Sequence, residues 1–130
     1  MRVLGLDYGA ARIGCAVSDR SGTLATPLPA IPSGDPAAVA TLAGESGAER
    51  IVIGLPVSLD GVEGPQAAET RRFGDQLAGL TDLPVEYYDE RFTTRMASRT
   101  RREAGASSDE DSIAAAHMLE TWLEAAGAGR

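Results

Sequence analysis

The order of the apolar segments constrains the fold of this chain more than any other feature. Short strand-like segments come first, at about residues 3–6, 12–18 and 23–31. They are separated only by turn residues, so they should pair as an antiparallel meander. The third segment carries Pro27 and Pro29, which cannot donate hydrogen bonds inside a sheet. We therefore expect that strand at an edge.

After the third strand the period of the sequence changes. Asp35 and Pro36 form a cap and first turn for a helix that runs toward Gly47. Further along, apolar and helical patterns predict a buried parallel strand, a helix, a strand and two helices, at about 50–56, 66–79, 84–88, 93–104 and 109–126. The predicted fold class is α/β, with a five-stranded mixed sheet of three antiparallel and then two parallel strands, flanked by helices.

Length and composition narrow the class of protein. The chain has 130 residues, of which 43% are hydrophobic, so residues 1–130 are expected to form one domain with its own core. No apolar run approaches the ~20 residues of a membrane span, and the chain opens as a strand instead of a signal sequence. We expect a cytoplasmic protein without membrane contact, in which Cys15 is a buried, reduced thiol.

The chain is acidic overall, but one segment, residues 91–102, is rich in arginine. The net charge is −7, which argues against unspecific adhesion to nucleic acid. All 12 basic residues are arginine. Arg91, Arg95, Arg99 and Arg102 recur at helical spacing on one face. Such a stripe either pairs with local acids or contacts phosphates, and we predict Arg91, Arg95 and Arg99, together with Arg12, as nucleic-acid-binding residues.

Acidic residues stand at the ends of apolar segments, where burial makes charge costly without a cation or proton. Asp7 ends the first strand, and Gly9 leaves room there for a ligand, although a turn aspartate is the simpler alternative. Asp89 and Glu90 follow the fifth strand. Because side chains alternate along a strand, only one of them can face the same side as Asp7. The pattern leaves open which one does, and the other would form a surface ion pair.

Asp111 lies at the start of the last helix, in line with its apolar stripe. Steps of four, three and four residues lead to Ala115, Met118 and Trp122, so Asp111 is expected to point at the core. Helix capping through Ser107 or Ser108 is the alternative. His117 lies on the polar face of this helix and is expected to be solvated.

If these acids converge on one edge of the sheet, they form an oxygen site for one or two hard divalent cations. Mg²⁺ and Mn²⁺ are the cations that fit such ligands. Two-metal sites hydrolyse phosphodiester bonds by activating water and stabilising the leaving oxygen. Such a site needs no serine, cysteine or histidine nucleophile.

Taken in order, these motifs resemble the YqgF-type, or RuvX-like, family of pre-16S rRNA nucleases and Holliday-junction-resolvase-like proteins. The resemblance covers nearly the whole chain, and Asp-Glu-Arg-Phe-Thr-Thr at residues 89–94 combined with Gly54-Leu55-Pro56 is its most specific part. It implies a ribonuclease H-like fold, metal-dependent endonuclease activity, and Asp7, Glu90 and Asp111 as catalytic residues and metal ligands. It also selects Glu90 over Asp89.

The same resemblance implies a function in ribosome biogenesis, the processing of the 5′ end of pre-16S rRNA. Resolution of four-way DNA junctions is the alternative, and that reaction would require a symmetric homodimer to place two sites on opposed strands. A non-catalytic nucleic-acid or ribosome-associated module is an alternative of another class, which the acidic pI of about 4.6 makes credible.

Overall fold

The computed structural model of the protein describes residues 1–92 and 110–127. The strands of its sheet are β1 (Val3–Tyr8), β2 (Arg12–Ser18), β3 (Ala25–Pro32), β4 (Arg50–Leu55) and β5 (Val85–Asp89). The described helical elements are α1 (Pro36–Glu45), α2 (Pro65–Ala78), the short 3₁₀ helix η1 (Glu90–Phe92) and α4 (Glu110–Ala126). The helix predicted at 93–104 and the caps predicted at Ser107 and Ser108 lie outside the described residues.

The strands form one five-stranded sheet in the order β3-β2-β1-β4-β5. β1 pairs with β2, and β2 with β3, in antiparallel fashion, whereas β4 runs parallel to both β1 and β5. The predicted mixed sheet is therefore confirmed. β3 lies at an edge of the sheet, as predicted from Pro27 and Pro29, which have no amide hydrogen to donate to a neighbouring strand.

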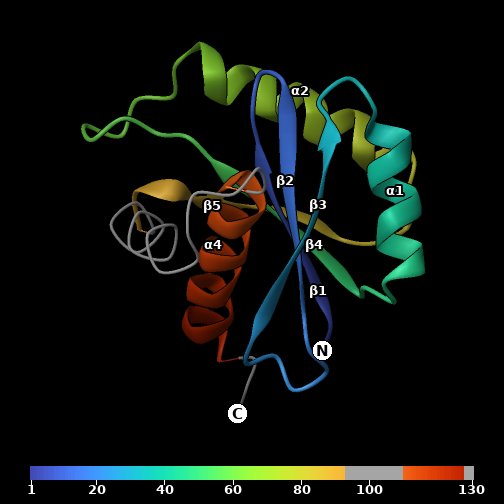
Figure 1. Cartoon of the computed structure of the whole chain (residues 1–130). Coiled ribbons are helices and arrows are strands. Elements are labelled where there is room, and N and C mark those ends of the chain that lie inside the picture. Colours follow the sequence, from blue (N-terminus) through green and yellow to red (C-terminus); the bar gives the residue numbers. More distant parts are fainter. Residues whose placement is uncertain (93–109, 128–130) are drawn as a thin grey trace.

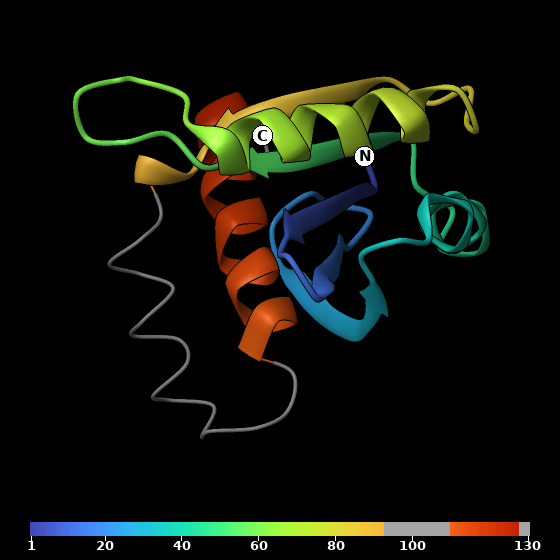
Figure 2. The same ribbon diagram turned by 90° about the horizontal axis from the view of Figure 1, so that it is seen from above.

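Helices cover both faces of the sheet, α1 and α2 on one and α4 on the other (Figures 1 and 2). Two core clusters follow from this arrangement. Leu4 and Leu6 of β1 pack in the cluster that contains residues of α1 and α2, and Val3 packs in the cluster of α4. Because side chains alternate along a strand, Gly5 and Asp7 also lie on the α4 face.

The predicted cap of α1 and the predicted apolar stripe of α4 are confirmed. The Asp35 carboxylate caps α1 by accepting a hydrogen bond from the Ala38 amide at 3.0 Å, and Pro36 occupies the first turn. Ala115, Met118 and Trp122 are buried, as the apolar stripe of α4 predicts. None of the helices in the described ranges has the length and apolar character needed to cross a bilayer.

Two side chains were predicted in opposite environments, and one prediction was wrong. Cys15 is fully buried, and burial raises the pKa of its thiol to about 12, as expected of a structural cysteine. His117 was expected to be solvated, but its Nε2 atom is shielded from solvent. The Ala25 amide of β3 donates to the Glu120 carboxylate at 3.2 Å, so β3 reaches the side of α4 that carries Glu120.

Candidate active site

Asp7 lies at the end of the central strand between two glycines. Its register partner on β2 is Gly14, and its partner on β4 is Gly54. All three residues lie on the face covered by α4, because they alternate with residues of the opposite core cluster. The missing side chains leave room on both sides of the Asp7 carboxylate, and a different acidic residue approaches on each side.

Glu90 approaches over Gly54. A Cβ atom at Gly54 would lie 2.7 Å from Oε1 of Glu90, so only glycine leaves space for this carboxyl group. The side chains of Glu90 and Asp7 share a hydrogen bond. Glu90 therefore meets Asp7, the choice that the residue pattern left open and that the family resemblance favours.

Asp89 forms the surface ion pair expected of the other carboxylate. Its Oδ2 atom lies 2.6 Å from Nη2 of Arg91 and accepts a second hydrogen bond from Nε at 2.8 Å. The Arg91 guanidinium lowers the pKa of Asp89. Arg91 Nη1 also donates to the backbone carbonyl of Leu59 at 3.3 Å. The guanidinium group that was predicted to contact phosphate therefore binds groups of the protein itself. Arg95 and Arg99 lie outside the described residues.

The first turn of α4 approaches over Gly14. A Cβ atom at Gly14 would lie 1.9 Å from the carbonyl oxygen of Asp111. Next to it, the buried hydroxyl of Ser112 accepts a hydrogen bond from the Cys15 amide at 3.1 Å. These contacts fix the start of α4 against β2, on the strand beside Asp7.

The Asp111 carboxylate differs from its prediction. It was expected to point at the core, but it is half-exposed and lies 3.3 Å from Nε of Arg12. The buried part of Asp111 is its main chain against Gly14, since the residue lies in the first turn of α4, at the margin of the sheet. An ion pair of this exposure contributes little to stability.

The contact between Asp7 and Glu90 sets the electrostatics of the site. Burial raises the pKa of Glu90 well above its ordinary range, and the hydrogen bond with Asp7 and the negative charges of Asp7 and Asp89 raise it further. Two carboxyl groups in contact cannot both ionise at low cost. They hold a proton between them or require a cation.

The predicted metal ligands are brought together only in part. Asp7 and Glu90 are in contact, and Asp111 lies in the first turn of the helix that packs beside them, with its carboxylate engaged by Arg12. Within residues 1–92 and 110–127, no group of three His, Cys, Asp or Glu side chains is close enough to hold a metal ion. The role of these acids as ligands stays a prediction.

The two glycines that make the contact possible were not among the predicted site residues. A glycine inside a strand often marks a close approach of another group, and Gly14 and Gly54 both interrupt apolar strand segments. That signal was present, but it did not say which groups would approach.

With this arrangement established, comparisons with known proteins identify the family. The family model of RuvX, described as Holliday junction resolvase, matches residues 1–125. The chain belongs to the RuvX family. A relative from Chloroflexus aggregans is 41% identical over 95% of this chain and 93% of its own length, and it is named "Putative pre-16S rRNA nuclease". A protein of the same name from Streptomyces coelicolor is 44% identical over 95% of this chain and 80% of its own length.

A solved structure is similar in fold to this chain. It is Thermus thermophilus RuvC in complex with a Holliday junction substrate, with a TM-score of 0.61 at 18% identity, and the match covers 98% of this chain and 96% of that one. The ribonuclease H-like fold class is confirmed by this match. The family resemblance and the nuclease class inferred from the sequence are likewise confirmed.

The packing of α4 on Gly14 predicts a strong effect of one methyl group. Gly14→Ala would push the added Cβ into the Asp111 carbonyl, so we expect a loss of about 1–3 kcal/mol in unfolding free energy, measured by urea denaturation. Gly44→Ala in α1 is the control, because nothing lies within 4 Å of its added Cβ. That variant should be neutral or more stable. Equal stability of Gly14→Ala and wild type would contradict the close approach.

The raised pKa of Glu90 predicts a pH-dependent cost in protein free of divalent cations. Above the ordinary value of 4.5, the folded state binds more protons at this group than the unfolded state. The free energy of unfolding therefore falls as pH rises from 4.5 to the folded-state pKa of Glu90, about 9. Glu90→Gln removes the cost, so its melting temperature in EDTA should exceed that of wild type by about 3–6 °C at pH 8, and by nothing near pH 4.5.

Glu124→Gln, at an exposed position of α4, is the control for this comparison. It should follow the wild-type profile at both pH values. A Glu90→Gln variant that is less stable than wild type at pH 8 would show that the ionised carboxylate is not a burden in the folded protein.

Proposed function

We propose that this protein is a metal-dependent endonuclease that hydrolyses phosphodiester bonds and processes the 5′ end of pre-16S rRNA. The observation that carries the proposal is the contact between Asp7 and Glu90 at the end of the central strand. The names of its relatives support the substrate. We accordingly place the protein in the cytoplasm, where such a precursor is processed.

The residues present fit a divalent cation. Two carboxyl groups in contact offer hard oxygen ligands and carry a charge that a cation would neutralise, which suits Mg²⁺ or Mn²⁺. Asp7 and Glu90 would hold the ion, and Asp111 would join them as a third ligand once its carboxylate is released from Arg12. When bound, it would supply activated water and stabilise the leaving oxygen of the cleaved bond.

The chain's own residues would prepare the site for this chemistry. Gly14 and Gly54 make room beside Asp7 for the first turn of α4 and for the Glu90 carboxyl group, so the acidic residues can gather there. Arg12 lies 3.3 Å from Asp111 on the exposed margin, and we propose that it contacts a backbone phosphate there. Arg95 and Arg99 remain predicted phosphate contacts, whereas the engaged donors of Arg91 favour a positioning role for that residue.

Resolution of four-way DNA junctions is a second candidate, favoured by the description of the matching family model. It differs from rRNA processing in its geometry, because opposed strands must be cut by two sites in a homodimer. The non-catalytic alternative differs in chemistry, since it requires no metal and no hydrolysis.

Asp7→Asn tests the proposal directly. The variant keeps the shape of the side chain but loses the charge that would bind the cation, so cleavage of precursor rRNA should fall at least about 100-fold. Glu110→Gln, at the residue next to Asp111, is the matched control and should cleave as wild type does. A four-way DNA junction, assayed with the same proteins and Mn²⁺, tests the second candidate.

Metal binding has a readout of its own. Mn²⁺ should raise the melting temperature of wild type and Glu110→Gln, and leave that of Asp7→Asn unchanged. Unimpaired cleavage by Asp7→Asn would refute both nuclease candidates. Nucleic-acid binding that survives in Asp7→Asn, with no cleavage and no metal response in wild type, would favour the non-catalytic module.

A further inference from the structure

The loop of residues 57–64, between β4 and α2, has a defined shape. The Ser58 amide donates to the Val62 carbonyl at 3.1 Å, and the Gly61 amide donates to the Ser58 carbonyl at 2.8 Å. The Asp60 carboxylate accepts a hydrogen bond from the Val62 amide at 3.1 Å. Gly61 has a φ of +86°, which only glycine adopts without strain. These hydrogen bonds give the backbone of the loop a defined conformation.

Two arginines fasten this turn to the body of the protein. Arg91 of η1 donates to the carbonyl of Leu59, as described above. Arg71 of α2 makes two hydrogen bonds with the Glu63 carboxylate, at 2.7 and 2.8 Å, and lies over the ring of Tyr87 at 4.9 Å. Asp89 and Glu63 thus neutralise both cations, and neither offers uncompensated charge to a phosphate.

The turn lies beside the candidate active site. It begins soon after Gly54, over which the Glu90 carboxyl group lies, and Arg91 is the residue after Glu90. Figures 1 and 2 both show the loop projecting past the end of the sheet next to η1. A nucleic-acid strand that reaches Asp7 and Glu90 would extend past this loop.

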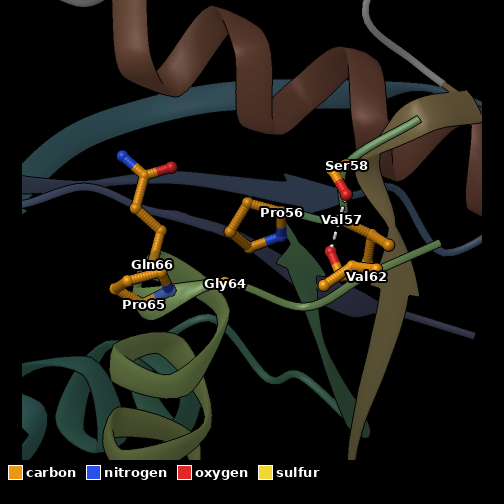
Figure 3. A pocket seen from close by; sticks show the side chains of 7 residues that line it. All are labelled: Pro56, Val57, Ser58, Val62, Gly64, Pro65 and Gln66. Atoms are coloured by element: carbon orange, nitrogen blue, oxygen red, sulfur yellow. Dashed lines mark hydrogen bonds between the residues drawn. The ribbon is translucent and has the colours of Figure 1, made fainter. Parts of the chain in front are cut away.

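The loop and the start of α2 line an open pocket of about 440 Å³, within the ~300–1,000 Å³ of small-molecule sites. Figure 3 shows Pro65 and Gln66 on one side, Val57, Ser58 and Val62 on the other, and Pro56 between them. The walls are mostly apolar. The Gln66 amide can donate and accept hydrogen bonds, whereas the Ser58 hydroxyl donates within the loop, to Asp60 and Val62, and can accept one. Two apolar side chains of this loop stay open to solvent, Leu59 at 93% and Val62 at 58% exposure.

We propose that this pocket binds an unpaired nucleobase of the substrate, close to the bond that is cut. Apolar walls suit the flat face of a base, and the amide and hydroxyl groups suit its hydrogen-bonding edge. Recognition of a phosphate is disfavoured here because Arg71 and Arg91 are already paired. The proposal rests on the proposed function and adds to it a substrate class, nucleic acid that is single-stranded beside the cleavage site.

Val62→Ser and Gln66→Ala, both changes in the lining of the pocket, test it without touching the carboxylates. Single-stranded RNA with 2-aminopurine at successive positions reports binding independently of cleavage. At one position its fluorescence should change on addition of wild-type protein. The two variants should weaken the affinity about five- to tenfold. Leu80→Ser is the matched control, because Leu80 is also apolar and 52% exposed but lies after the far end of α2.

An abasic site at the responding position tests whether the base itself is recognised. It should weaken binding by wild type as much as Val62→Ser does, and Val62→Ser should cause no further loss on the abasic strand. Unchanged affinity of Val62→Ser for intact RNA, with normal cleavage, would overturn the pocket and leave the nuclease standing. A position-specific response in a protein that cleaves nothing would support the pocket and refute the nuclease.

The same variants separate a base from a second copy of the chain. If the pocket is a protein interface, Val62→Ser should change the sedimentation of the protein alone, and that result would overturn the proposal. Fully paired RNA should give no position-specific response in wild type. An equal response from paired RNA would overturn it as well.

Discussion

The pairing of Asp7 with Gly14 on one side and Gly54 on the other is the constraint on which the site depends. Two positions without side chains, one on each neighbouring strand, let the Glu90 carboxyl group and the first turn of α4 approach the same aspartate. The contact of α4 with β2 and the contact of Glu90 with β4 thus depend on the registers in which β2 and β4 pair with β1. A one-residue slip of either strand would place a side chain where these groups now lie.

This arrangement concentrates negative charge in a well-packed region. β1 and β4 place fully buried Leu4, Leu6, Ile51 and Ile53 just before Asp7 and Gly54, and this apolar burial supports a pair of carboxyl groups that does not favour folding when ionised. Functional sites commonly depart from the locally most stable choice in this way. The two ionised carboxyl groups would stabilise the folded protein, instead of destabilising it, if a divalent cation bound between them.

The arginines show that attraction to nucleic acid is local in this acidic protein. In the described parts of the chain, Arg71 and Arg91 pair with acids and fasten the loop of residues 57–64, whereas Arg12 pairs with Asp111 on the exposed margin, away from that loop. Structural and phosphate-binding arginines therefore cannot be separated by composition. In our proposals, positive charge serves the phosphate at the margin and the apolar pocket serves the base.

The sequence by itself determined the succession of three antiparallel and two parallel strands, the edge position of β3 through its prolines, the cap of α1 and the buried stripe of α4. Each of these depends on residues close together in the chain or on a simple period. Only the tertiary structure brought Glu90 to Asp7, turned the Asp111 carboxylate toward Arg12, shielded Nε2 of His117 and directed the Arg91 donors to Asp89 and the loop. The physical reason is that such partners are chosen by strand register and helix packing between distant segments, which no local pattern of residues specifies.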